Sequence, residues 1–179
     1  MQSTGRSDRP PSCHPSLTID GETFRLSHLS SFTVVVPGKG KTTGADLTIE
    51  VFISNHVVTE RSGHGDPRHV QDHHGTWRKF DRERYDMSLT LQRRLKDHIV
   101  SNTPTHVSKS YGGRKNLVVV EAGKTKWTVI FCFKPSPRSD QVEMHVLSAH
   151  SKEIHERNIK REHLLVFARR CLYSGNRVP

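Results

Sequence analysis

Apolar residues are scarce in this sequence, and its few cysteines form no recognisable framework. Hydrophobic residues fill 32% of the 179 positions, which predicts that part of the chain is tail or exposed loop. The three cysteines form an odd set without a C-x-x-C pair, which argues against a disulfide-stapled secreted fold. No apolar run is long enough to span a membrane or to form a standard signal peptide. These absences predict a cytoplasmic protein that does not insert into membranes.

Acidic residues are also few compared with basic ones. Lys and Arg number 28 against 18 Asp and Glu, which gives a net charge of +10 with neutral His and a pI of about 9.9. This imbalance is typical of nucleic-acid-binding proteins, although a simply basic, soluble surface has the same composition. The length suits one domain, which we place at residues 17–175. Residues 1–16 are predicted to be a disordered basic tail, and 176–179 a second short tail.

The stretch 116–149 has the clearest pattern and predicts a β-meander. Its middle strand is apolar on both faces, so we expect it at the centre of a covered sheet, with Trp127 and Phe131 facing inward. In the following strand, Glu143 and His145 are expected to face outward. Earlier strands are predicted at 32–36 and 46–54, and a hairpin around Asp20-Gly21.

Two helices complete the prediction, at Arg84–Ser101 and Ser151–Tyr173, the second ended by Gly175. Residues 57–80 are expected to form a long polar loop. The fold class is therefore α+β, a mainly antiparallel twisted sheet with a β-meander in the C-terminal half and about two packed helices.

His56 is the first candidate for chemistry, because it follows a well-patterned strand and histidine exchanges protons near neutrality. A hydrogen-bonded loop histidine has the same sequence appearance. Arg84, just before the predicted helix, suits bidentate phosphate binding or ordinary surface ion pairing. A basic set interleaved with aromatic residues suits a nucleic-acid backbone: Lys109, Arg114, Lys115, Lys124 and Lys126.

The loop from His64 to His74 offers a metal-binding alternative. Its histidines are His64, His69, His73 and His74. Zinc needs three or four converging ligands, and this loop has neither cysteines nor a regular helical frame to align them. We therefore predict no metal site and no cofactor, and keep a zinc-binding protein as an open alternative.

Several short segments together resemble a known group of proteins. They are S-N-H-V-V-T from Ser54, G-T-W-R-K-F-D-R-E-R-Y from Gly75, N-L at Asn116, the Trp127 strand and L-S-A-H from Leu147. In order and spacing they resemble an uncharacterised bacterial family often carried on mobile elements. That family is in turn similar to the barnase–EndoU–colicin–RelE superfamily of small ribonuclease toxins. The chain departs from the pattern at Leu147, where an acid is usual, and at His150, where tyrosine is usual.

The resemblance implies a metal-independent, toxin-like protein that cleaves RNA through the 2′-hydroxyl group. The site residues that it implies are His56, Thr59, Arg84, Asn116 and Ser148. RNA is the expected partner, together with a neutralising or target protein. The alternative is a non-catalytic protein that binds nucleic acid or blocks a partner on the same scaffold.

Overall fold

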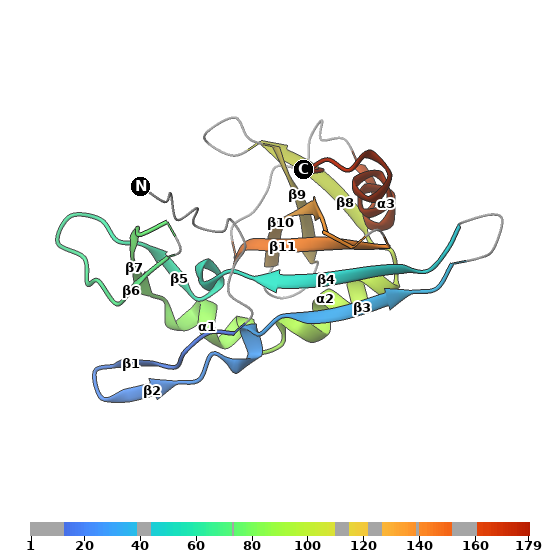
Figure 1. Ribbon diagram of the computed structural model, residues 1–179. Coiled ribbons are helices and arrows are strands. Elements are labelled where there is room, and N and C mark those ends of the chain that lie inside the picture. The colour runs from blue at the N-terminus through green and yellow to red at the C-terminus, as the bar shows by residue number, and fades with distance from the viewer. Residues whose placement is uncertain are drawn as a thin grey trace, which may run out of the picture.

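A seven-stranded sheet forms the centre of the computed structural model, which describes residues 13–38, 44–72, 74–109, 115–121, 127–138, 140–151 and 161–179. Its strands, in spatial order, are β12 (Arg161–His163), β8 (Pro104–Lys109), β9 (Lys115–Glu121), β10 (Trp127–Pro135), β11 (Gln141–His150), β4 (Leu47–Ile53) and β3 (Phe32–Val36). Every neighbouring pair is antiparallel except β11 and β4, which are parallel. Figure 1 shows the strong twist of this sheet. The predicted α+β class is confirmed.

The predicted meander is the middle of this sheet. β10 pairs with β9 on one side and with β11 on the other, and it occupies the central position. Trp127 and Phe131 are buried in the main hydrophobic core, as expected. The helices α2 (Leu91–Val100) and α3 (Leu164–Ser174) add their apolar stripes to this core: Leu91, Leu95, Ile99, Leu164, Phe167, Ala168 and Cys171. Removing this apolar surface from water is the main stabilising contribution.

The second face of β11 is buried as well, which corrects the expectation that Glu143 and His145 face water. Their residues are 7% and 1% exposed. Nε2 of His145 lies 2.7 Å from Oε2 of Glu143, and the His145 ring contacts Phe52 on β4. An alternating strand pattern therefore gave the correct faces but not their exposure, because covering segments come from elsewhere in the chain.

The helix predicted at Arg84–Ser101 is instead two helices, α1 (Arg82–Ser88) and α2. α1 begins earlier because the Asp81 side chain accepts a hydrogen bond from the Arg84 backbone N–H at 3.1 Å and caps the first turn. α1 ends at Ser88, whose hydroxyl donates to the Tyr85 carbonyl at 2.7 Å and competes with the helical backbone. The apolar four-residue repeat continues through the break, so periodicity alone did not reveal it.

The helix predicted at Ser151–Tyr173 is shorter in the described residues. Residues 152–160 lie outside them, Arg161–His163 form β12 against β8, and α3 begins only at Leu164. The Asn102 side chain accepts a hydrogen bond from the Leu165 backbone N–H at 2.8 Å, which fixes this start. Gly175 ends the helix with φ of 62°, as predicted.

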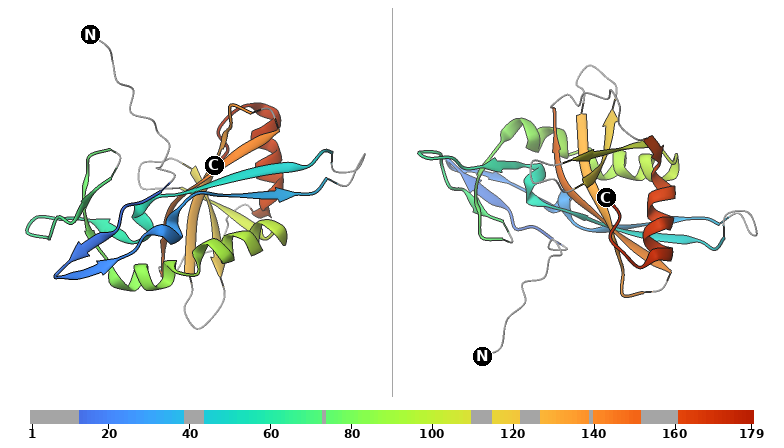
Figure 2. Two further views of the ribbon diagram at one scale, coloured as in Figure 1. Left: turned by 60° about the horizontal axis from the view of Figure 1, so that its bottom comes forward. Right: turned by 90° about the horizontal axis from the view of Figure 1, so that it is seen from above.

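The segment predicted as a long polar loop forms a short 3-10 turn, η3 (Asn55–Val57), and a small antiparallel sheet. Its strands are β5 (Thr59–Arg61), β6 (Val70–Gln71) and β7 (Trp77–Phe80), in the order β5-β7-β6. These strands are too short for sequence alternation to distinguish them from loop. Figure 2 shows the small sheet projecting from the same end of the molecule as the hairpin β1 (Leu17–Ile19) and β2 (Glu22–Phe24).

The Asp20-Gly21 hairpin is confirmed, since both turn residues have positive φ, 52° and 83°. A short 3-10 turn, η1 (Ser27–Leu29), then leads into β3. Residues 1–12 lie outside the described residues, so the disordered tail stays a prediction. Immediately after them, Nε2 of His14 donates to the Ile53 carbonyl at 2.8 Å. In the part of the chain that the structure describes, no helix has the length and apolarity needed to cross a membrane.

Two partly buried histidines near the start of the chain predict a pH dependence of stability. Nε2 of His28 bonds to the Ser88 hydroxyl at 2.7 Å, and burial lowers the pKa of both His14 and His28 below their ordinary value of 6.5. Histidines in the unfolded chain then bind protons at a higher pH than the folded ones. The free energy of unfolding is therefore expected to fall as pH drops below about 6.5.

Denaturant unfolding measured between pH 7 and pH 5 checks this prediction. The double variant His14→Gln, His28→Gln should have a flatter slope than wild type. His64→Gln is the matched control, because His64 is exposed. An unchanged slope in the double variant would contradict the prediction.

Candidate functional site

The residues after β4 form a rigid turn that presents His56. The Ser54 hydroxyl accepts a hydrogen bond from the His56 backbone N–H at 3.2 Å and caps η3. Val57 and Val58 are fully buried beneath this turn, and the His56 side chain remains 25% exposed. The local sequence therefore anchors the backbone in the core and leaves the imidazole at the rim.

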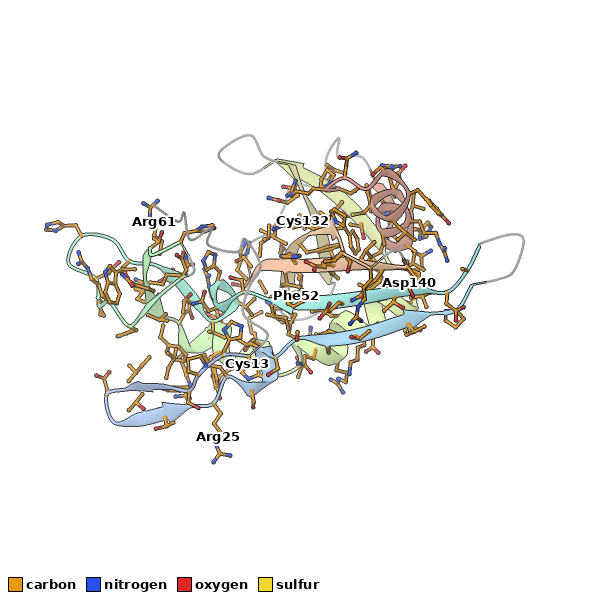
Figure 3. All side chains as sticks on the ribbon, in the orientation of Figure 1. Cys13, Arg25, Phe52, Arg61, Cys132 and Asp140 are labelled. Atoms are coloured by element: carbon orange, nitrogen blue, oxygen red, sulfur yellow. The ribbon has the colours of Figure 1, made fainter. Side chains whose placement is uncertain are left out.

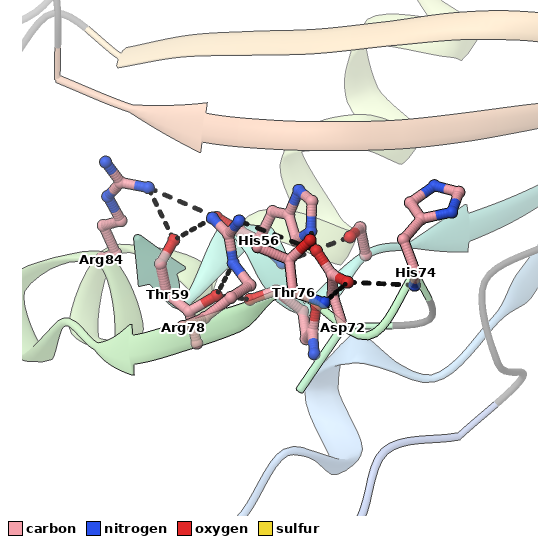
Figure 4. A network of polar contacts seen from close by, with 9 residues as sticks. His56, Thr59, Asp72, His74, Thr76, Arg78 and Arg84 are labelled. Carbon is pink, nitrogen blue, oxygen red and sulfur yellow. Dashed lines mark hydrogen bonds and ion pairs between the residues drawn. The ribbon is translucent and has the colours of Figure 1, made fainter. Parts of the chain in front are cut away.

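His56 is paired with a buried carboxylate from the small sheet. Its Nε2 lies 3.0 Å from Oδ2 of Asp72, whose side chain is 3% exposed. A carboxylate only accepts, so Nε2 carries the hydrogen and Nδ1 carries the lone pair. Figure 4 shows the two side chains pointing toward each other. The pair has the base-and-orienter arrangement that general acid–base catalysis uses.

A tight turn holds Asp72 in place. Its second oxygen, Oδ1, accepts from the backbone N–H groups of His74 at 3.0 Å and Thr76 at 2.9 Å, and Gly75 takes a positive φ of 82°. Burial acts to raise the pKa of Asp72. The bonds from Thr76, His56 and His74 outweigh it, so the pKa is below its usual value and the carboxylate is charged at neutral pH.

Two arginines surround Thr59, which is fully buried. Nε of Arg78 donates to Thr59 Oγ1 at 2.7 Å, and Nη2 of Arg78 donates to the Thr59 carbonyl at 3.1 Å. Nη1 of Arg78 is also 4.0 Å from Oδ2 of Asp72. Arg78 thus links Thr59 to the pair of His56 and Asp72.

Arg84 completes the network from the start of α1. Its Nη1 donates to the Thr59 carbonyl at 2.8 Å and to the His56 carbonyl at 3.4 Å, and its Nε lies 3.2 Å from Asp81. The side chain is 16% exposed. The structure therefore brings together three of the five residues implied by the resemblance: His56, Thr59 and Arg84.

The other two residues lie elsewhere. Asn116, on β9, is buried, and its Oδ1 accepts from Nη2 of Arg177 at 2.9 Å. Ser148, on β11, is half-buried and pairs with Ile130 on β10. No hydrogen bond among the described residues that we identify joins either side chain to His56 or Asp72.

The family model comparison covers most of the chain. A model of the YjaZ family matches residues 16–172. The chain belongs to the YjaZ family. No curated protein and no solved structure matches it, so the likeness to ribonuclease toxins stays a prediction.

In this YjaZ family member, the other sequence candidates are only partly described. Lys109 and Lys115 pair through their backbones at the ends of β8 and β9, and Arg114, Lys124 and Lys126 lie outside the described residues. His73 is also outside them. Among the described residues, no three His, Cys, Asp or Glu side chains are grouped to hold a metal ion.

Two site residues were missed by sequence reasoning in this YjaZ protein. Asp72 was considered only as a neighbour of the histidine loop, and Arg78 was not singled out. Asp72 is 16 residues from His56 in sequence and meets it through a turn of the small sheet. An Asp followed by Gly75 is a turn signal that could have located the carboxylate, but not its partner.

The position of Arg84 predicts a structural effect rather than a catalytic one. Arg84→Ala is expected to lower the free energy of unfolding by about 1–3 kcal/mol, because the variant loses charged hydrogen bonds to Thr59 and Asp81. Denaturant unfolding measures this loss. Arg93→Ala, an exposed change on α2, is the control and should leave stability nearly unchanged. Undiminished stability of Arg84→Ala would contradict the prediction.

Proposed function

We propose that this protein cleaves RNA without a metal ion, with His56 as the group that transfers protons. The observation that carries the proposal is the pairing of a partly exposed imidazole with a buried, charged carboxylate, His56 with Asp72. The motif resemblance to small ribonuclease toxins supports the same reading. A toxin-like role in bacteria or their mobile elements forms the finer part of this proposal.

The chemistry needs little from the protein because RNA carries its own nucleophile. Nδ1 of His56 takes the proton of the 2′-hydroxyl, whose oxygen attacks the adjacent phosphorus. The bond from phosphorus to the 5′-oxygen breaks, and the imidazolium gives its proton to that oxygen. The products are a 2′,3′-cyclic phosphate and a 5′-hydroxyl. Asp72 stabilises the imidazolium formed between the two transfers.

Incubating purified protein with total RNA in EDTA tests the proposal. RNA fragments with 2′,3′-cyclic phosphate ends are the expected result. A His56→Ala preparation, purified in parallel, controls for contaminating ribonuclease. Intact RNA with wild-type protein, or equal cleavage by both preparations, would overturn the proposal.

The second candidate is a non-catalytic protein that binds nucleic acid or blocks a partner. The observation that favours it is that Arg78 and Arg84 already bind Thr59, Asp72 and Asp81, as in a purely structural network. RNA binding that weakens steeply with salt, without cleavage, is its expected signature. Affinity that is independent of salt would instead indicate a protein partner.

A further inference from the structure

Arg61 and Arg78 lie directly opposite each other in the small sheet. They are register partners of β5 and β7, so their side chains lie on the same face. The Ser62 N–H bonds to the Trp77 carbonyl, and the Arg78 carbonyl accepts from His69 on the other side. Arg61 and Arg78 therefore form a non-hydrogen-bonded pair, in which Cα atoms approach to about 4.5 Å and side chains are closest.

Such a pair of like charges is unfavourable unless something neutral or negative lies between them. Burial lowers the pKa of Arg78 most strongly. The charge of Asp72 opposes this effect, whereas the charges of Arg84 and Arg61 add to it. The single buried carboxylate therefore faces a cluster of three guanidinium groups.

The three arginines differ in how their donors are used. Arg78 and Arg84 donate to Thr59, and their side chains are 10% and 16% exposed. Arg61 is exposed at the end of β5, and no hydrogen bond or ion pair ties its guanidinium to another described residue. Figure 3 shows Arg61 directed away from the ribbon at the small sheet. Its donors are thus available to a ligand.

We infer that Arg61 is the phosphate-binding residue of this site and, given the proposed function, positions an RNA phosphodiester beside His56. The guanidinium fork matches two phosphate oxygens, and a bound phosphate supplies the negative charge that the pair Arg61 and Arg78 lacks. Arg78 connects this position to Asp72 and hence to His56. Arg61 acts on substrate binding, and His56 on the chemical step.

Binding of a 2′-O-methyl RNA oligonucleotide tests this inference, because that RNA lacks the attacking hydroxyl and cannot be cleaved. Arg61→Ala is expected to raise its Kd about tenfold or more and to reduce the salt dependence of log K by about one phosphate contact. With cleavable RNA, KM should rise in the variant while kcat is retained. Arg61→Gln keeps most of the side-chain volume and should behave in the same way.

Arg25→Ala is the matched control. Arg25 is also an exposed arginine, and Figure 3 shows it directed away from the molecule on the opposite side from Arg61. This variant loses the same charge and should bind the oligonucleotide as wild type does, apart from a small general effect. Equal weakening by Arg25→Ala and Arg61→Ala would overturn the inference and leave only a nonspecific charge effect.

Thermal unfolding with inorganic phosphate gives a readout that needs no RNA cleavage. Phosphate should raise the Tm of wild type more than chloride at equal ionic strength, and this difference should disappear in Arg61→Ala. Without phosphate, the variant should be as stable as wild type or more so, because a like-charge pair is removed. Equal oligonucleotide affinity and equal phosphate response in wild type and Arg61→Ala would overturn the inference. Weakened binding in Arg61→Ala together with undiminished cleavage by His56→Ala would overturn the proposed function and leave the phosphate site standing.

Discussion

His56→Ala is expected to slow RNA cleavage by at least about a hundredfold while the protein stays folded. The imidazole is the one titratable group of the network that is both partly exposed and held by a buried carboxylate. Its loss removes proton transfer but no apolar core contact. Asp72 keeps its bonds from His74 and Thr76 and its ion pair with Arg78, so the stability change should stay near 1 kcal/mol. Single-turnover cleavage and Tm on the same preparations measure both effects.

Asp72→Asn separates positioning from simple removal of the histidine. The amide is close in shape to the carboxylate, but it neither stabilises an imidazolium nor fixes the Nε2–H tautomer of His56. Cleavage should fall at least about tenfold, and its pH profile should shift, since the charge beside the base is gone. A purely structural Asp72 would change Tm but leave the pH profile of cleavage in place. Full activity in both variants would remove the pair from the mechanism.

The largest stability effect is expected at the second histidine–carboxylate pair. Glu143→Ala should lower the free energy of unfolding by about 3–5 kcal/mol, because it leaves His145 buried without its 2.7 Å partner. The two side chains are 9% and 1% exposed, so water cannot replace the lost contact. Denaturant unfolding with a check of the m-value measures the loss.

Glu162→Ala is the matched control for this prediction. Glu162 pairs with Arg170 at 3.0 Å, but the Arg170 side chain is 47% exposed, so removal should cost less than about 1 kcal/mol. Replacing Glu143 and His145 together by apolar residues of similar size should restore much of the stability lost in Glu143→Ala. A loss in Glu143→Ala no larger than in Glu162→Ala would show that the pair is solvated in the native protein.

Local patterns in the sequence were enough to predict the core of this fold. The two-faced apolar strand at Trp127–Pro135 was placed at the sheet centre, and Asp20-Gly21 and Gly175 were predicted as a hairpin turn and a helix end. Each of these features depends on a short segment: a period of two, or a residue that tolerates positive φ. His56 was likewise identified from its position after β4.

Only the tertiary structure decided the surroundings of these elements. The parallel pairing of β4 with β11, the burial of Glu143 and His145, and the break between α1 and α2 depend on contacts between distant segments. The site depends on such contacts too, since Asp72 reaches His56 through a turn and Arg61 meets Arg78 through strand register. A periodic pattern specifies which face of an element is apolar. It does not specify which segment covers that face or which side chain supplies a hydrogen-bond partner, because these depend on how the whole chain packs.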